Sequence, residues 1–229
     1  MKTSLLIFLL CFVLSCVNNN SPDSSSNIVS DSDSITFRAR MQRYEKLYAD
    51  PNSPYRNEAA AVTIYDSILA SPYYNSAEKM AIRKKLQLAR QNRVGQQAND
   101  FIYYAPSGAA ESLYLLKADY TLLYFYNPEC NACKEMKNTL IASPILKQNI
   151  NTGKLKILAI YPDPDSTLWK KHLPELPQEW IHGRDKQQYL WENKIYDLRA
   201  IPTIYLLDKD KKVLLKDCMD IAAIEHALS

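Results

Sequence analysis

The pattern of apolar and polar positions changes several times along the chain. Residues 1–15 carry an almost unbroken apolar run behind Lys2, and residues 17–34 consist mostly of Ser, Asn and Asp. From Ile35 to about Arg93, apolar residues recur every three or four positions, which is the period of an amphipathic helix, and prolines separate the runs. This segment is therefore predicted to form about three helices.

After Gly95 the pattern changes to short runs rich in β-branched and aromatic residues, separated by helical stretches. The predicted strands are 98–104, 121–126, 155–161, 203–208 and 213–216, and the predicted helices are 131–142, 165–173, 185–197 and 221–228. Alternating strands and helices indicate an α/β sheet, and the polar turn at 209–212 indicates a closing antiparallel hairpin. The predicted organisation is a helical module over 35–94 followed by an α/β domain over 95–229.

The N-terminal residues are typical of an export signal followed by a tether. An apolar run of about ten residues is too short for a permanent transmembrane helix, which needs about 20. The sequence Val13-Leu14-Ser15-Cys16 resembles a bacterial lipobox, in which the signal is removed before a cysteine that is then lipidated. The prediction is a signal peptide over 1–15, lipidation of Cys16 and a flexible polar tether over 16–34. The alternative is an ordinary cleaved signal peptide with an incidental cysteine.

Composition and charge exclude several classes of function. The chain has 28 basic and 25 acidic side chains, for a net charge of +3, which is too balanced to predict a nucleic-acid partner. Its four glycines, Gly95, Gly108, Gly153 and Gly183, lie too far apart to form a dinucleotide fingerprint or a phosphate-binding loop. Nucleotide chemistry is therefore not expected, and no organic cofactor is implied.

Two of the five cysteines form a motif that carries chemistry. Cys130-Asn-Ala-Cys133 follows the predicted strand 121–126 and leads into the predicted helix 131–142. Unpaired amide groups and the helix dipole at a helix N-terminus stabilise a thiolate, so Cys130 is the expected nucleophile. The spacing brings Cys133 within disulfide range while leaving it more shielded. We expect Cys130 to attack a substrate disulfide and Cys133 to resolve the mixed disulfide.

The order of these elements resembles the thioredoxin-like arrangement of a strand, a short turn, Cys-x-x-Cys and a helix. Residues 95–101 resemble the opening strand of TlpA/ResA-type thioredoxins, and Ile201-Pro202-Thr203 resembles the cis-proline turn of that fold. The similarity covers 95–229, and the whole chain resembles uncharacterised thioredoxin-family lipoproteins of Bacteroidota. The resemblance implies a central mixed sheet flanked by helices and thiol-disulfide oxidoreductase activity. It also implies that Ile201, before a cis Pro202, offers its backbone to an extended substrate peptide.

The chain departs from the family pattern near the motif. Residues 127–129, Asn-Pro-Glu, replace the usual tryptophan-containing approach to the first cysteine. The strand 121–126 lacks the buried carboxylate that serves thioredoxin as a proton acceptor. Glu111, Asp119 and Glu135 are candidates for that role, and none of them is favoured.

The expected partners follow from the motif and the anchor. They are protein thiol or disulfide substrates, a redox partner protein, and a membrane reached through the lipid on Cys16. The resemblance to lipoproteins implies the envelope of a Gram-negative bacterium, and Val17 after the cysteine favours the outer membrane. No nucleic acid is expected.

Two other functions remain as alternatives. A redox-inactive adaptor would use the fold for binding, and six of the 16 tyrosines lie between residues 103 and 126, where they suit either an interface or a strand. A metal-handling chaperone would need a third ligand beside the two cysteines, whereas His172, His182 and His226 are each isolated in sequence. The presence of both cysteines favours redox chemistry. Cys218 is interpreted as a small buried side chain.

Overall fold

The computed structural model describes residues 24–229, with side chains from residue 32 onward. The predicted signal peptide and the predicted lipidation site at Cys16 lie outside the described residues. Packing contacts divide the chain between Ala39 and Arg40, and each part is described by itself. The predicted domain boundary between residues 94 and 95 stays a prediction.

Helix α1 (Ser24–Tyr48) supplies the described residues of the first part. The predicted flexible tether was wrong over residues 24–34, which are helical. Once a helix is nucleated, each further residue adds a hydrogen bond at low cost, so the amphipathic stretch that begins at Ile35 extends into the polar residues before it. Among the described residues, no helix is long and apolar enough to cross a membrane.

Helices α2 (Glu58–Ala70) and α3 (Ser76–Ala89) follow in the second part and confirm the helical prediction for this segment. Helix α3 begins with a capping box, in which Asn75 accepts from the backbone N–H of Glu78 and the Glu78 carboxylate accepts from the backbone N–H of Asn75. The apolar side chains that recur at helical spacing are buried on both helices; they are Ala61, Ile64, Ile68, Ile82 and Leu86.

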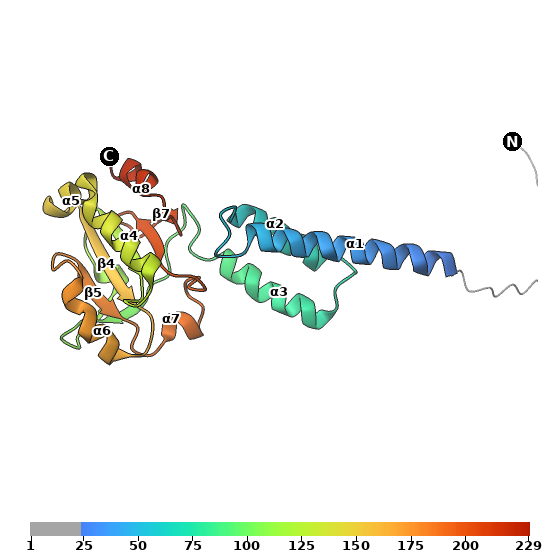
Figure 1. The fold of residues 1–229 in the computed structure, drawn as a ribbon, viewed down its shortest axis with the longest axis horizontal. Helices are drawn as coiled ribbons and strands as arrows, with labels where there is room; N and C mark the ends of the chain where they lie inside the picture. The colour runs from blue at the N-terminus through green and yellow to red at the C-terminus, as the bar shows by residue number, and fades with distance from the viewer. Residues whose placement is uncertain (1–23) are drawn as a thin grey trace, which may run out of the picture. The chain divides into compact units, whose positions relative to one another are not determined.

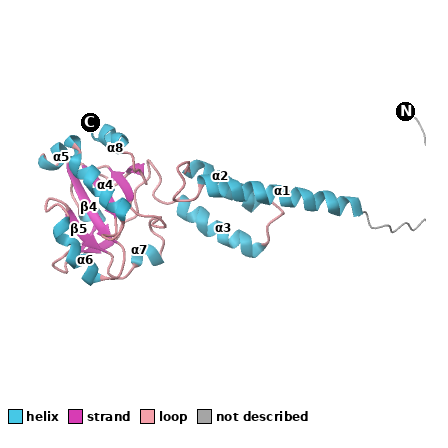
Figure 2. Ribbon diagram, in the orientation of Figure 1, coloured by secondary structure: helices cyan, strands magenta, loops and turns pink. Residues whose placement is uncertain are grey.

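After the helices, the described chain forms a mixed sheet with helices packed against it (Figures 1 and 2). The sheet has seven strands in the order β2-β1-β5-β4-β3-β6-β7. Its strands are β1 (Ile102–Tyr104), β2 (Ala110–Ser112), β3 (Tyr120–Phe125), β4 (Leu155–Tyr161), β5 (Ile181–Arg184), β6 (Thr203–Leu207) and β7 (Val213–Lys216). Strands β3, β4 and β5 are parallel, whereas β6 pairs antiparallel with β3 and β7. The predicted α/β class and thioredoxin-like fold are confirmed.

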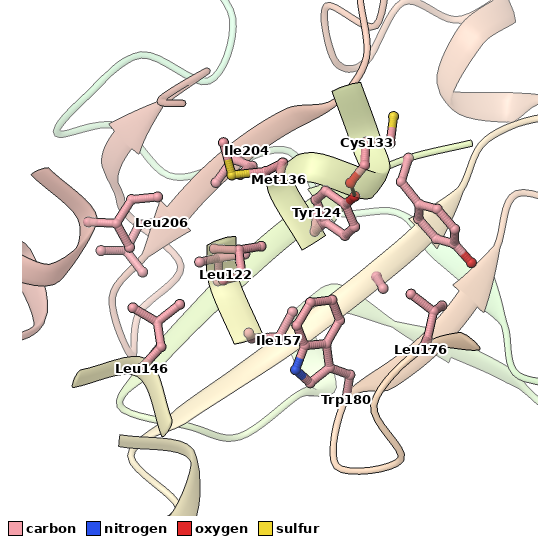
Figure 3. Packing of buried hydrophobic residues seen from close by; sticks show 14 of the residues in the cluster. Leu122, Tyr124, Cys133, Met136, Leu146, Ile157, Leu176, Trp180, Ile204 and Leu206 are labelled. Carbon is pink, nitrogen blue, oxygen red and sulfur yellow. Dashed lines mark hydrogen bonds between the residues drawn. The ribbon is translucent and has the colours of Figure 1, made fainter. Parts of the chain in front are cut away.

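Helices and loops cover both faces of this sheet. The helices are α4 (Asn131–Ala142), α5 (Pro144–Asn151), α6 (Ser166–His172), α7 (Tyr189–Glu192) and α8 (Ile221–Leu228), with short 3-10 turns η1 (Leu113–Leu115) and η2 (Leu173–Glu175). Alternate residues of β3 enter opposite cores. Leu122 packs in the same core as Met136 of α4 (Figure 3). Leu123 packs in the core on the other face of the sheet. Burial on both faces explains why β3 and β4 read as continuous apolar runs.

Two predicted elements differ from the structure by several residues, and some elements of the structure were not predicted. Strand β1 begins at Ile102, four residues later than predicted. The backbone N–H of Ala98 donates to the carbonyl of Lys211, so Ala98 does not take part in the ladder of β1. The predicted helix 185–197 shortens to α7, since Gln188 and Lys194 on either side adopt left-handed backbone angles. Strands β2 and β5 and helix α5 were not predicted.

Strand β5 depends on a glycine that carries no strand signal of its own. A Cβ at Gly183 would lie 2.6 Å from Cδ2 of Tyr103 and 2.7 Å from Cδ1 of Ile160. Only glycine lets β5 lie this close to the side chains above it. The requirement comes from a long-range contact, so a local pattern does not reveal it.

Candidate active site

Cys130 lies at the N-terminus of α4, directly after the loop that leaves β3. It is the N-cap residue of the helix, and its Sγ accepts a hydrogen bond from the backbone N–H of Cys133 at 3.2 Å. The side chain is partly exposed. A sulfur in this position faces unpaired amide groups and the positive end of the helix dipole, both of which stabilise a thiolate.

Cys133 lies one turn further along α4 and points into the core. Its side chain is 1% exposed, and like Cys130 it is a free thiol in the structure. Burial, together with a smaller effect of the hydrogen bond with Cys130, raises the pKa of the Cys133 thiol to about 12. The two cysteines therefore differ as the spacing predicts, with Cys130 accessible and Cys133 shielded and protonated at neutral pH.

The approach to the motif is held by Asn127, which sequence reasoning did not single out. Its Nδ2 donates to Asp163 at 2.7 Å, and its Oδ1 accepts from the backbone N–H of Glu129 at 2.9 Å. Its carbonyl also accepts from the backbone N–H of Cys130 at 3.1 Å. Asn127 thus fixes the loop where the family pattern has a tryptophan. An asparagine directly before a proline was the available signal, since this pair favours turns.

The Ile201–Pro202 turn reaches the same place from a distant part of the sequence. The peptide bond between the two residues is cis, and the carbonyl of Ile201 lies 3.7 Å from Sγ of Cys130, which donates to it. Strand β6 begins immediately afterwards at Thr203, which pairs with Phe125 at the end of β3. The sheet register therefore brings the turn and the cysteine motif together.

A hollow with an empty volume of about 540 Å³ adjoins this turn. Its lining consists of Pro162, Asp163, Gln188, Trp191, Leu198 and Ile201. Trp191 is 52% exposed, which is unusual for a side chain of this size. The space beside the Ile201–Pro202 turn thus has an apolar wall that is open to solvent.

Tyr124 occupies the buried end of β3 beneath α4. Its hydroxyl donates a hydrogen bond of 2.6 Å to the backbone carbonyl of Cys133 (Figure 3). The ring stacks on Tyr126, with 5.4 Å between ring centroids, and burial raises the pKa of Tyr124 above its ordinary value. These two tyrosines belong to the core, so they do not form an exposed aromatic surface.

The three carboxylates considered as proton acceptors lie elsewhere. Glu111 is on the edge strand β2, where its carboxylate accepts from the hydroxyl of Tyr103 at 2.8 Å. Asp119 directly precedes β3 and so lies at the N-terminal end of this strand, whereas the cysteine motif follows its C-terminal end. Glu135 is exposed on α4. None of the three is among the residues that line the hollow bordered by Cys133, which has an empty volume of about 260 Å³.

Cys218 is only half-buried, between β7 and α8. Its Sγ donates to the carbonyl of Asp220 at 3.7 Å, and burial raises the pKa of its thiol. It packs against the edge of the core that contains Cys133. In residues 32–229, no three His, Cys, Asp or Glu side chains are grouped so that they could hold a metal ion.

Comparisons with known proteins place this geometry in a family. The profile of a family described as thioredoxin-like matches residues 118–213. A thioredoxin-like protein from Bacteroides caccae is 45% identical, with a TM-score of 0.82 over 85% of this chain and 70% of that one. The C-terminal domain of an uncharacterised protein from Bacteroides fragilis is 47% identical, with a TM-score of 0.58 over 60% of this chain and 97% of that one.

More distant similarity shows the fold alone. The thioredoxin domain of a thiol-disulfide oxidoreductase from Bacteroides vulgatus is 20% identical, with a TM-score of 0.51 over 59% of this chain and 95% of that one. No similar sequence was found among curated proteins.

Proposed function

Because the chain belongs to the thioredoxin-like family, we propose that it is a thiol-disulfide oxidoreductase that acts on proteins through Cys130 and Cys133. The observation that supports this most directly is the position of Sγ of Cys130. It lies at a helix N-terminus, 3.2 Å from the backbone nitrogen of Cys133 and 3.7 Å from the carbonyl of Ile201. An accessible sulfur, a shielded second sulfur and a backbone acceptor beside them are what disulfide exchange with a peptide requires.

The proposed reaction has two exchange steps. The Cys130 thiolate attacks a substrate disulfide, which releases one substrate thiolate and forms a mixed disulfide. Cys133 then attacks Sγ of Cys130, which releases the second substrate thiolate and leaves the Cys130–Cys133 disulfide. The substrate disulfide gains the two electrons that the dithiol loses. A redox partner protein restores the dithiol, and in the oxidising direction each step is reversed.

Ile201 and Pro202 are the proposed substrate-binding residues. An extended peptide beside this turn can pair with the backbone of Ile201 while its sulfur faces Cys130. The hollow lined by Leu198 and Trp191 would then receive an apolar side chain next to the substrate cysteine.

Insulin reduction coupled to dithiothreitol tests the redox function. The wild-type protein is expected to accelerate insulin precipitation, and Cys130→Ser is expected to abolish the acceleration. Cys218→Ser is the matched control and should retain full activity, because Cys218 lies outside the motif. Equal activity of the wild type and Cys130→Ser would favour the adaptor function instead. The reduction potential then gives the direction: about −270 mV indicates a reductase and about −120 mV an oxidant.

We also propose that the protein is anchored in the cell envelope by a lipid on Cys16, in the outer membrane of a Gram-negative bacterium. The support is the lipobox resemblance of residues 13–16 and the residue Val17 after the cysteine. Cell fractionation with radiolabelled palmitate tests this. The wild-type chain is expected to carry label and sediment with membranes, and Cys16→Ala is expected to lose both properties. Label on Cys16→Ala would contradict the proposal.

A further inference from the structure

A second hollow lies beside Cys133, with an empty volume of about 260 Å³, part of which is open to solvent. It is bounded by the end of β3 and the loop after it, by α4, by the last residue of α6 and by the end of η2. The side chains with polar atoms that line it include Tyr124, Tyr126, Cys133, Lys137, His172 and Glu175. The hollow has room for water, so it connects the buried thiol to groups that can exchange protons.

His172 and Glu175 form a hydrogen-bonded pair on the wall of this hollow. Nδ1 of His172 lies 2.6 Å from Oε1 of Glu175. The carboxylate can only accept, because His172 lowers the pKa of Glu175, so Nδ1 carries the hydrogen and Nε2 is left as the basic nitrogen. Nζ of Lys137 donates to the backbone carbonyl of Glu175 at 3.1 Å, which ties the pair to the helix that carries Cys133.

The other titratable groups on this wall do not suit proton acceptance. Lys134 and Lys137, both on α4, are hydrogen-bond donors, and Nζ of Lys137 already donates to the carbonyl of Glu175. Burial raises the pKa values of Tyr124 and Tyr126, so both hydroxyls stay protonated. Lys170 and Lys171, on the same helix as the histidine, are exposed.

We propose that the imidazole of His172, oriented by Glu175, accepts the proton of Cys133 through water in this hollow. The proposal rests on the proposed function and adds a residue to it. As the proton leaves, the Cys133 sulfur attacks Sγ of Cys130 and a bond forms between them. The bond between Cys130 and the substrate sulfur breaks, and its electron pair leaves with the substrate thiolate. His172 then returns the proton to that thiolate or to solvent.

In this proposal, His172 and Glu175 take the role of proton acceptor that a buried carboxylate on the central strand has in thioredoxin and that β3 lacks. A carboxylate that orients a histidine is a common arrangement for general-base catalysis, and such bases contribute about 100-fold or more to a rate. The shielded thiol needs a base of this kind, because burial keeps Cys133 protonated at neutral pH. The reverse reaction uses the same groups, with His172 in its protonated form as the donor.

Single-turnover kinetics with Ellman's reagent separate the two sulfur steps. Reduced full-length protein mixed with one equivalent of the reagent releases a first thionitrobenzoate when Cys130 attacks and a second when Cys133 resolves the adduct. His172→Gln is expected to slow the second release about 100-fold and leave the first unchanged. The wild-type second phase should follow the titration of one imidazole, whereas in His172→Gln it should rise with hydroxide concentration.

Two further variants make the outcome clear. Glu175→Gln keeps the size of the side chain and is expected to slow the second phase by a smaller factor, about 10-fold. His172→Ala should recover part of the second phase when imidazole is added to the buffer. The matched control is His226→Gln, an exposed histidine on α8, which should behave as wild type.

A second phase in His172→Gln with the wild-type rate and pH profile would overturn the proposal. Failure of the proposed function would look different, because the first thionitrobenzoate release would then be slow in the wild-type protein and insensitive to Cys130→Ser. The two failures are therefore distinguishable in one experiment.

Discussion

The hydroxyl of Tyr124 lies 2.6 Å from the backbone carbonyl oxygen of Cys133, and it donates a hydrogen bond to that oxygen from beneath α4. This contact joins the central strand β3 to the first turn of the helix that carries both cysteines. Both side chains are 1% exposed, so water does not compete for the bond. The position of the shielded cysteine is thus set by the sheet as well as by its own helix.

Removal of this hydroxyl should loosen the first turn of α4. Tyr124→Phe is expected to lower the free energy of unfolding by about 1 kcal/mol, the usual contribution of one hydrogen bond. Urea unfolding followed by circular dichroism measures the change. Tyr55→Phe, at a 66% exposed tyrosine, is the control and should be neutral. Identical midpoints for Tyr124→Phe and wild type would show that the contact does not contribute to stability.

The two cysteines of the motif should differ in alkylation. With iodoacetamide at pH 7, Cys130 of the reduced native protein is expected to react while Cys133 stays unmodified. Burial raises the pKa of Cys133 to about 12, so the reactive thiolate forms only as the pH approaches that value, or once denaturant exposes the side chain. Peptide mass spectrometry gives the result directly. Rapid native modification of Cys133 at pH 7 would contradict its shielding.

A buried carboxylate outside the site should make stability sensitive to acid. Asp197, 7% exposed, binds Arg199 at 2.8 Å and Arg56 at 3.1 Å. Burial opposes its ionisation, but the hydrogen bond and charge of Arg199, together with Arg56, outweigh burial, so the pKa of Asp197 falls below its ordinary value. The contribution of the Asp197 carboxylate to the free energy of unfolding is therefore present above about pH 4 and is lost as the pH falls through the folded-state pKa.

Asp197→Asn tests this arrangement. At pH 7 the free energy of unfolding of the variant should be lower than that of the wild type by about 2 kcal/mol. This loss is smaller than that expected for breaking a fully buried ion pair, because the arginines are partly exposed. Wild type and variant should converge in stability as the pH falls below about 4. Guanidinium unfolding at several pH values provides the comparison. If the two free energies of unfolding differ by the same amount at every pH, the charge on Asp197 does not account for the loss of stability.

The glycine of β5 should tolerate no side chain. Gly183→Ala is expected to destabilise the protein by about 1–3 kcal/mol, because its Cβ would overlap with Tyr103 and Ile160. Differential scanning calorimetry measures the loss. Adding Ile160→Val removes Cδ1, one of the two overlapping atoms, and should restore part of the stability. An unchanged melting temperature for Gly183→Ala would contradict the close approach of β5 to Tyr103 and Ile160.

Local features of the sequence predicted the elements that carry the cysteine motif. Strand β4, strand β7, helix α4 and helix α8 have the predicted bounds, because each has a strong apolar period and clear turn residues at its ends. The Cys130–Cys133 spacing was likewise a local property, since two intervening residues make one helical turn. The cis form of the Ile201–Pro202 peptide matched the resemblance.

Contacts between distant segments decided the rest. Strand β5 exists because Gly183 fits beneath Tyr103, and Asn127 is fixed by Asp163, 36 residues further along the chain. The sequence by itself determined the helix, the strand and the pair of sulfurs. Only the tertiary structure placed His172 and Glu175 on the hollow beside Cys133, because hydrogen-bond geometry and burial depend on packing between segments that no local period encodes.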